Sequence, residues 1–393
     1  MKNSRREFIL RTGLAGFALS AAGRRQLLGE YKAVGRTENK LQFVSPVEGD
    51  MLNGYDGIST GGSLQTRVLI SAPPDRKISL NGMDTNYEDG IYRADILLKD
   101  FENKLEAVDT GSGEKQIITV YWLRNYADKY RLSFDDNIWF LKDISDNSNR
   151  YRSIFENPYL GFIKEVHKTY GTKIHLNIYF QTEGFNLSQL TDKFKSEWKD
   201  NADWLRLSFH ALQNDPDKPY IHAGYNEVKK DCDKVVEQIR RFAGEENTGP
   251  VTTLHWGEAT VEGCRALRDS GYRVLAGYFN ADGPDPVSYY LEKDKVRHIE
   301  KRYIWHDNLT DLIFDRIALV INTVSMDQIL PHLDNLKSGM HRPAFIDLMI
   351  HEQYFYPFYM NYQPDYRQKV ITSVKWAADH GYKPAFLGDA IFG

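Results

Sequence analysis

The stretch from Asn125 to the C-terminus alternates between strand-like and helix-like segments, and this alternation restricts the fold more than any other feature of the chain. The strand-like runs are short and apolar, whereas the segments between them carry apolar residues near helical spacing. Strands are expected at Tyr130–Phe134, Lys173–Phe180, Trp204–Phe209, Val251–His255, Arg273–Ala276, Asp315–Ile321, Phe345–Ile350 and Pro384–Leu387. Helices are expected at Ile154–Tyr170, Leu187–Asn201, Glu227–Gly244, Thr260–Gly271, Ser325–Ser338 and Pro364–Gly381. Because parallel strands need a crossover between them, this order predicts an α/β domain, with a barrel of seven or eight strand–helix units favoured over an open doubly wound sheet.

A different pattern precedes this domain, from about Leu41 to Leu123. Short alternating runs are cut by turn signals such as Asn81-Gly82 and Asp89-Gly90. Strands are expected at Leu41–Val44, Leu64–Ser71, Lys77–Leu80, Gly90–Leu97, Asn103–Asp109 and Lys115–Trp122, a spacing typical of an immunoglobulin-like sandwich. The segments around these two turns resemble bacterial Ig-like modules that accompany carbohydrate enzymes. The resemblance implies a spacer or docking module over residues 37–124, because a fold alone supplies no site.

Residues 1–36 are expected to form an export signal and a linker. Arg5 and Arg6 precede a bulky apolar pair, and a weakly apolar run with small residues follows over Gly13–Gly23. This arrangement resembles the twin-arginine export signal. The resemblance implies a bacterial protein that is exported folded and works in the periplasm or outside the cell. Past this segment no apolar run is long enough to span a membrane, so no transmembrane anchor is expected after signal removal.

Polar side chains gather where the expected strands of the α/β domain end. Asp135 and Asp136 follow the first strand, His210 the third, His255 the fourth and His351 the seventh. Because the carboxyl ends of barrel strands meet at one face, these side chains are expected around a single site. Two adjacent carboxylates repel each other, and the pair is easiest to hold if one binds a cation while the other handles a proton. Neutral imidazole and carboxylate are the ligands that zinc and similar ions take in open catalytic sites.

These segments resemble motifs of the polysaccharide deacetylases, which are metal-dependent carbohydrate esterases built on an irregular barrel. Ser133-Phe-Asp-Asp136 matches their Asp-Asp motif, which implies Asp135 as the general base and Asp136 as a metal ligand. Leu348-Met-Ile-His351 matches the motif whose histidine is the general acid, and His210 matches the first histidine of a His-x-x-x-His metal motif. The resemblance covers roughly residues 125–393. It implies a divalent cation, zinc first, with cobalt or nickel as the other candidates.

Two motifs depart from the family pattern. The second histidine of His-x-x-x-His is replaced by Asn214, and the segment Thr253-Leu-His-Trp-Gly257 lacks the arginine and prolines of the family's Arg-Pro-Pro-Tyr-Gly. The third metal ligand is therefore open among His255, Asn214 and His222. His255 is favoured because it leaves the neighbouring strand.

Aromatic side chains near the strand ends are candidates for substrate contacts, because a flat apolar ring stacks well on the C–H face of a sugar. We expect Trp139, Trp256 and Tyr354 to have this role. Glu352 follows His351 directly, and three roles are open for it: orienting His351, binding the metal, or standing as a surface carboxylate.

Together these features predict an exported, metal-dependent hydrolase that removes acetyl or other acyl groups from a polysaccharide or oligosaccharide. Two other functions stay open. One is a glycoside hydrolase that pairs Asp135 with Glu352 or Asp315 across a glycosidic bond, and the other is a metal-free barrel that binds glycan. The formal net charge of −4 over 393 residues offers no basic surface of the kind that binds nucleic acid.

Overall fold

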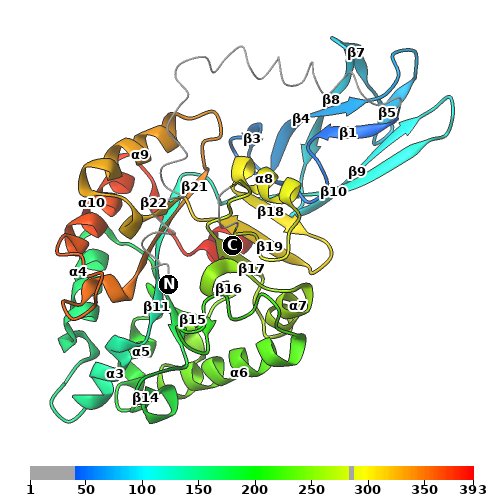
Figure 1. Cartoon of the computed structure of the whole chain (residues 1–393). Helices are drawn as coiled ribbons and strands as arrows, with labels where there is room; N and C mark the ends of the chain where they lie inside the picture. Colours follow the sequence, from blue (N-terminus) through cyan, green and yellow to red (C-terminus); the bar gives the residue numbers. More distant parts are fainter. Residues whose placement is uncertain (1–39, 283–286) are drawn as a thin grey trace. The chain divides into compact units, whose positions relative to one another are not determined.

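The computed structural model describes residues 40–282 and 287–393, and the chain divides into two compact units (Figure 1). One unit ends at Ala127, and the other comprises Asp128–Gly393. The expected export signal in residues 1–36 lies outside the described residues. In the described ranges no helix is long and apolar enough to cross a membrane. The expected domain limits, 37–124 and 125–393, remain predictions.

The smaller unit consists of two β-sheets around a common core. One sheet has the order β1(Gln42–Ser45), β4(Ser63–Ser71), β8(Ile91–Leu98), β7(Asn86–Glu88), with β3(Ile58–Thr60) also paired to β4. The other has the order β2(Met51–Leu52), β10(Lys115–Trp122), β9(Glu102–Asp109), β5(Ile78–Leu80), β6(Met83–Asp84). Buried Leu64, Val68 and Ile70 alternate along β4 and join residues of both sheets in one cluster. The assignment of this unit to the immunoglobulin-like class remains a prediction.

The larger unit is a mixed α/β structure, as the sequence predicts. Its first sheet is parallel, with the order β15(Leu205–Ala211), β12(Ile174–Tyr179), β11(Lys129–Asn137), β21(Phe345–His351), β20(Leu319–Val320), and β22(Lys383–Pro384) also pairs with β11. Its second sheet has the order β16(Val251–Thr253), β17(Val274–Gly277), β19(Leu312–Arg316), β18(Ile304–Asp307), and β18 is antiparallel to β19. A separate antiparallel pair is formed by β13(Gln181–Thr182) and β14(Phe185–Asn186). The ladders of the two main sheets do not close into one continuous ring.

Short contacts join the two sheets at both edges. Between β19 and β20 the backbone crosses from one sheet to the other, where Ile317 N donates to Gly277 O and Ala318 N donates to Asp347 O, each at 2.8 Å. Between β15 and β16 the hydroxyl of Thr252 donates to Phe209 O. Because the backbone changes sheets between β19 and β20, the expected single strand Asp315–Ile321 is divided between these two strands.

Helices lie around the strands (Figure 1). They are α3(Trp139–Asp146), α4(Pro158–Tyr170), α5(Lys195–Asp200), α6(Tyr225–Phe242), α7(Val261–Asp269), α8(Lys293–Arg302), α9(Met326–Ser338), α10(Tyr366–Asp379) and α11(Leu387–Phe392). Three expectations are wrong. The expected helix Leu187–Asn201 is only a 3-10 turn at Leu187–Gln189 followed by the short helix α5. The segment Gly277–Asn308, where no helix or strand is expected, contains α8 and β18, and α8 is so rich in charge that only Val296 and Ile299 mark its buried side. The expected strand Pro384–Leu387 is only a two-residue bridge, because α11 begins at Leu387.

The strands of the parallel sheet have an apolar outer face and a polar inner face. Along β11, Leu132 and Phe134 are buried in the core shared with the helices, while Arg131, Ser133 and Asp135 alternate with them. Because successive residues of a strand point to opposite faces, the three polar side chains share the inner face. Neighbouring strands continue this face with His175, Asn177, Ser208, His210, Asp347 and His351.

Arg131 and Asp347 form a buried ion pair on this inner face. Arg131 donates to Asp347 Oδ2 from Nε at 3.0 Å and from Nη2 at 2.7 Å. Its Nη1 donates to His175 Nδ1 at 3.2 Å, which assigns the neutral tautomer of His175, since a guanidinium can only donate. Burial alone would lower the pKa of Arg131, but the nearby carboxylates, Asp347 foremost, raise it above its ordinary value. The interior therefore keeps a charged arginine.

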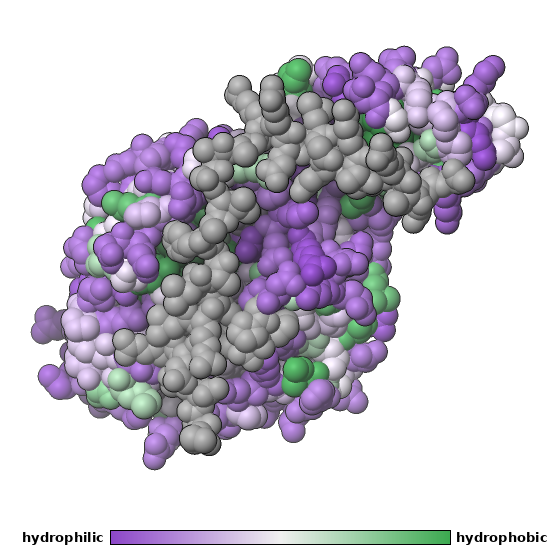
Figure 2. Space-filling model, turned by 45° about the horizontal axis from the view of Figure 1, so that its top comes forward, coloured by the Kyte–Doolittle hydropathy of each residue, from purple (hydrophilic) through white to green (hydrophobic). Residues whose placement is uncertain are grey.

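On the face drawn in Figure 2 most of the coloured surface is hydrophilic, with hydrophobic side chains scattered over it. Exposed large hydrophobic residues of the larger unit include Phe358 and Met360, which follow β21.

Asp347→Asn should destabilise the larger unit by about 3–5 kcal/mol, because it leaves the buried Arg131 charge without its carboxylate. Denaturant unfolding followed by tryptophan fluorescence measures this, since Trp122 alone among the seven tryptophans precedes residue 128. Asp379→Asn is the matched control: it breaks an exposed pair with Lys375 and should cost less than about 1 kcal/mol. Equal effects of the two substitutions would contradict a structural role for the buried pair.

Stability should also fall in mild acid because of His175. Burial, followed by the charge of Arg131, holds the pKa of His175 well below its ordinary 6.5, so the unfolded chain binds a proton there that the folded chain does not. The contribution of neutral His175 to the free energy of unfolding is complete above about pH 6.5. It is lost as the pH falls below that value, at up to about 1.4 kcal/mol per pH unit. His175→Gln retains an acceptor for Arg131 but cannot titrate. Its unfolding free energy should therefore depend less steeply on pH between 6.5 and 5, and an unchanged slope would refute the assignment.

Candidate metal-binding active site

Asp135 and His351 lie side by side at the carboxyl ends of two neighbouring strands. The parallel register of β11 and β21 pairs the two residues directly, so their side chains share the inner face. Asp135 accepts a hydrogen bond from Asn177 Nδ2 at 2.5 Å. Burial raises the pKa of the Asp135 carboxyl to about 6. A carboxyl held in this range is suited to accept and release protons near neutral pH.

Asp136 also reaches the interior because β11 is irregular at its end. The pairing of β11 with β12 shifts between Phe134 and Asn137, and Asp136 has a left-handed backbone with φ of 63°. This conformation costs a non-glycine residue about 1–3 kcal/mol and is typical of functional sites. Its effect is to break the alternation of the strand, so that two consecutive carboxylates face the same interior.

Three ligand-type atoms converge beside Asp135. Asp136 Oδ1 lies 3.0 Å from His210 Nε2 and 3.2 Å from His255 Nδ1, and the two nitrogens are 3.3 Å apart. All three side chains are buried. Ligand atoms around a tetrahedral zinc ion with bonds of about 2.0–2.1 Å lie about 3.3 Å from one another. The observed separations therefore fit a small divalent cation.

Backbone carbonyls determine which imidazole nitrogens carry protons. His210 Nδ1 lies 2.5 Å from Thr253 O, and His255 Nε2 lies 2.9 Å from Asn214 O. A carbonyl oxygen only accepts, so these two nitrogens are the donors, and the lone pairs of His210 Nε2 and His255 Nδ1 point toward the carboxylate. Metal-binding histidines typically donate their second nitrogen in this way. Two imidazole lone pairs and a carboxylate oxygen at this spacing form a donor set that a divalent cation could occupy.

The two other candidates for the third ligand lie elsewhere in the arrangement. His222 is exposed, and in the described part of the chain the one group of this kind is Asp136, His210 and His255. The side chain of Asn214 is exposed, and its amide oxygen accepts a hydrogen bond from Gln353 Nε2 at 3.0 Å. The backbone oxygen of Asn214 orients His255, and its amide oxygen lies 3.4 Å from the hydroxyl of Tyr179.

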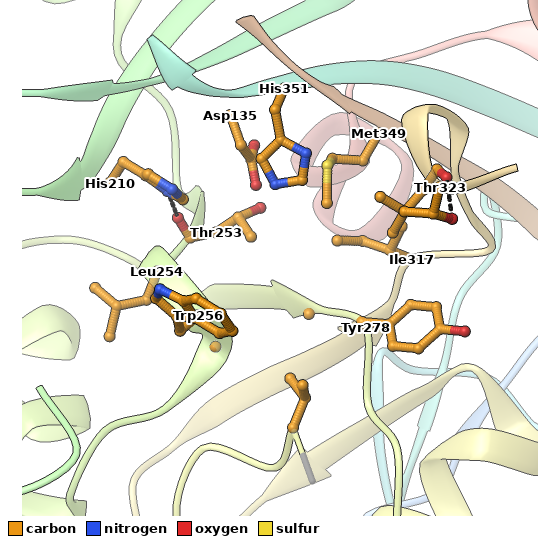
Figure 3. A pocket seen from close by; sticks show the side chains of 14 residues that line it. Asp135, His210, Thr253, Leu254, Trp256, Tyr278, Ile317, Thr323, Met349 and His351 are labelled. Atoms are coloured by element: carbon orange, nitrogen blue, oxygen red, sulfur yellow. Dashed lines mark hydrogen bonds between the residues drawn. The ribbon is translucent and has the colours of Figure 1, made fainter. Parts of the chain in front are cut away.

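A cavity of about 90 Å³ opens beside these residues. Asp135, His351 and His210 form its polar end, and Trp256 and Tyr278 lie at the opposite side (Figure 3). Its remaining walls are largely apolar and include Leu254, Val287, Ile317, Val320 and Met349. The cavity therefore joins a proton-transfer pair to a small hydrophobic space.

Three residues of the site were not anticipated. Asn322 Oδ1 accepts from both the backbone N–H and Nδ1 of His351, at 3.2 and 2.9 Å, and so directs His351 Nε2 away from itself. Asn177 donates to Asp135, and Tyr179 donates to Asp136 Oδ1 at 2.5 Å. Asn177 and Tyr179 follow His175 at two-residue spacing, which marks one face of a strand. That spacing was the available signal.

The three aromatic residues expected to contact substrate lie in different places. Trp256 lines the cavity. Trp139 packs instead against the rings of Tyr356, Phe358 and Tyr359 and lines a separate groove of about 570 Å³. Tyr354 is buried, with its ring centroid 6.1 Å from that of His351. Of the three, the structure brings only Trp256 into the cavity.

Glu352 has a role that none of the three expectations describes. It is fully buried and accepts hydrogen bonds from the backbone N–H groups of Ile138, Trp139 and Phe140 and from the hydroxyl of Tyr356. It therefore caps the first turn of α3, where Ile138 offers no capping side chain. Burial raises the pKa of Glu352 to about 7. The expected surface position is wrong, and Glu352 does not line the cavity.

No family model matches the chain, and no curated protein matches it either. Among solved structures, 4-alpha-glucanotransferase from Thermococcus litoralis is similar over 68% of this chain, with 9% identity and a TM-score of 0.45, and the chain covers only 40% of its length. A CE4 esterase from Streptococcus mutans matches over 66% of this chain and 86% of its own, with 11% identity and a TM-score of 0.35. The carbohydrate deacetylase Agd3 matches over 90% of this chain and 73% of its own, with 7% identity and a TM-score of 0.35. Similarities this weak carry no argument about activity, which rests on the residues of the site.

Metal content should depend on the converging residues. We expect protein from residue 37 onward to hold close to one divalent cation per chain by inductively coupled plasma mass spectrometry. Asp136→Ala, His210→Ala and His255→Ala should each lower metal affinity by at least about tenfold, because each removes one donor. His222→Ala is the control, since His222 is exposed and lies outside the group. Loss of metal in His222→Ala but not in His255→Ala would overturn the ligand assignment.

Proposed function

We propose that the chain is a metal-dependent hydrolase that removes acyl groups, acetyl foremost, from a polysaccharide or oligosaccharide. The observation that carries this proposal is the convergence of two imidazole lone pairs and a carboxylate oxygen directly beside a proton-transfer pair. Asp136, His210 and His255 would hold the cation. The donor set of two nitrogens and one oxygen suits zinc first, with cobalt or nickel as alternatives. A divalent cation bound there supplies Lewis acidity, which polarises the carbonyl of an acyl group.

Asp135 and His351 divide the proton chemistry between them. Asp135 is buried and lines the cavity, so as a carboxylate it accepts the proton of the attacking water. His351 donates from Nε2 to the departing nitrogen or oxygen, because its Nδ1–H is held by Asn322. The two residues occupy paired positions on adjacent strands, which supports their acting on the same reacting group. Both amide and ester cleavage fit these roles.

The cavity walls favour a small acyl group. Leu254, Val287 and Met349 offer apolar surface to a methyl group close to Asp135 and His351. In this proposal the acyl group is inserted beside Asp135 and His351, and the glycan lies toward the open side of the cavity. Trp256 stands at the edge of this space and is the best placed of the expected aromatic residues to contact the sugar.

The other two functions receive less support. A glycoside hydrolase needs a second carboxylate across the cleft from Asp135, yet Glu352 is committed to α3 and neither Glu352 nor Asp315 lines the cavity. A metal-free glycan binder would leave the lone pairs of His210 and His255 facing a carboxylate with no cation. We also propose that the protein is exported by the twin-arginine route to the periplasm or beyond, and that the β unit is an Ig-like spacer.

Asp135→Asn should lower acetate release by about 10²–10⁴-fold while leaving metal content unchanged, because it removes the base and no metal ligand. His351→Asn should have an effect of similar size. We would measure acetate release from a panel of N- and O-acetylated oligosaccharides and metal content on the same samples. The two measurements separate loss of the base or acid from loss of the cation. Full activity in Asp135→Asn, or no release by the metal-loaded parent from any acetylated glycan of the panel, would refute the proposed function.

A further inference from the structure

Tyr179 stands in the middle of the proposed ligand group. It is the last residue of β12, which lies between the strand that carries Asp136 and the strand that carries His210. Its side chain is buried, and its ring centroid is 5.2 Å from the ring centroids of both His210 and His255. No motif in the sequence draws attention to it. Tyr179 can be assigned to the site only because it continues the polar inner face of β12.

The phenolic oxygen of Tyr179 is surrounded by acceptors. It lies 2.5 Å from Asp136 Oδ1, 2.9 Å from His255 Nδ1 and 3.4 Å from Asn214 Oδ1. His255 Nδ1 acts as an acceptor because its other nitrogen donates to the Asn214 carbonyl. A phenol has a single proton, so it can donate to one of these three atoms at a time. The phenolic oxygen therefore lies beside two of the three proposed ligand atoms.

We propose that Tyr179 binds the metal through its phenolic oxygen, as a fourth protein ligand beside Asp136, His210 and His255. This inference rests on the proposed function, because it needs the same cation. The phenolic proton leaves to solvent when the oxygen binds. With four protein ligands, water or substrate would have to bind as a fifth ligand, an expansion that occurs in some catalytic zinc sites. The resulting set has two nitrogens and two anionic oxygens.

The phenolate of Tyr179 would change which metal ions the site prefers. Asp136 and Tyr179 together balance the charge of a divalent cation, which strengthens its binding in a buried position. Oxygen donors also shift the preference toward harder ions than a nitrogen-rich set would take. Tyr179→Phe should therefore weaken metal binding by about 10–100-fold. Affinity alone does not establish direct ligation, because a hydrogen bond to Asp136 would have a similar effect.

Iron serves as the probe that separates the two roles. Protein from residue 37 onward is loaded with Fe(II), which is then oxidised on the protein to Fe(III), and bound iron is quantified. A phenolate bound to Fe(III) gives a charge-transfer band in the visible range, and resonance Raman scattering excited in that band shows the phenolate ring vibrations. We expect both signals in the parent and neither in Tyr179→Phe. Tyr220→Phe is the matched control, because Tyr220 is a buried tyrosine whose hydroxyl contacts Leu212 N and Asp231, and it should keep both signals.

Each outcome bears on a distinct claim. Iron bound by the parent without the band or the ring vibrations would overturn ligation by Tyr179 and leave the proposed function standing. Signals that persist in Tyr179→Phe would also overturn it. A parent that binds no iron, zinc or cobalt would refute the proposed function together with this inference. The parent's Raman spectrum shows that a phenolate is bound, and the variant assigns it. Iron is therefore raised until Tyr179→Phe is loaded, and the band is compared per bound iron atom.

Discussion

Two backbone carbonyls hold the imidazoles of His210 and His255, and the chemistry of the site depends on these two hydrogen bonds. Thr253 O takes the proton-bearing nitrogen of one ring and Asn214 O that of the other. Each ring is thereby left with a lone pair directed at Asp136 Oδ1, at 3.0 and 3.2 Å. Without a cation, three electron-rich atoms would repel one another inside a medium of low polarity. The divalent cation of the proposed function would remove this repulsion by occupying the space they share.

The polar inner face of the parallel sheet makes this concentration of charge possible. Arg131 and Asp347 neutralise each other on this face, and Asn177, whose oxygen accepts from Ser208, donates to Asp135. The apolar residues that alternate with them face the helices, so the same strands build the core and carry the site. The strained backbone at Asp136 adds a second carboxylate where regular alternation would provide one. Fold stability and site geometry are therefore set by the same few strands.

Most residues of the site can be predicted from the sequence by one rule, which is that the carboxyl ends of neighbouring parallel strands meet. That rule places Asp135, Asp136, His210 and His351 together. It does not decide among ligands for the third position, because His255 lies in a short turn past β16 whose direction depends on the left-handed backbone of Trp256. Tyr179 could not be predicted as a site residue, because a tyrosine at the end of a buried strand usually packs in the core. The role of Glu352 depends on α3, a helix that the residue pattern does not reveal.

The most direct test of the central claim is a crystal structure of the protein grown with zinc, with diffraction data measured above and below the zinc absorption edge. The account predicts one strong anomalous peak among Asp136 Oδ1, His210 Nε2 and His255 Nδ1, within about 2.0–2.2 Å of each. An empty position between these three atoms, or zinc bound only at surface carboxylates, would contradict it.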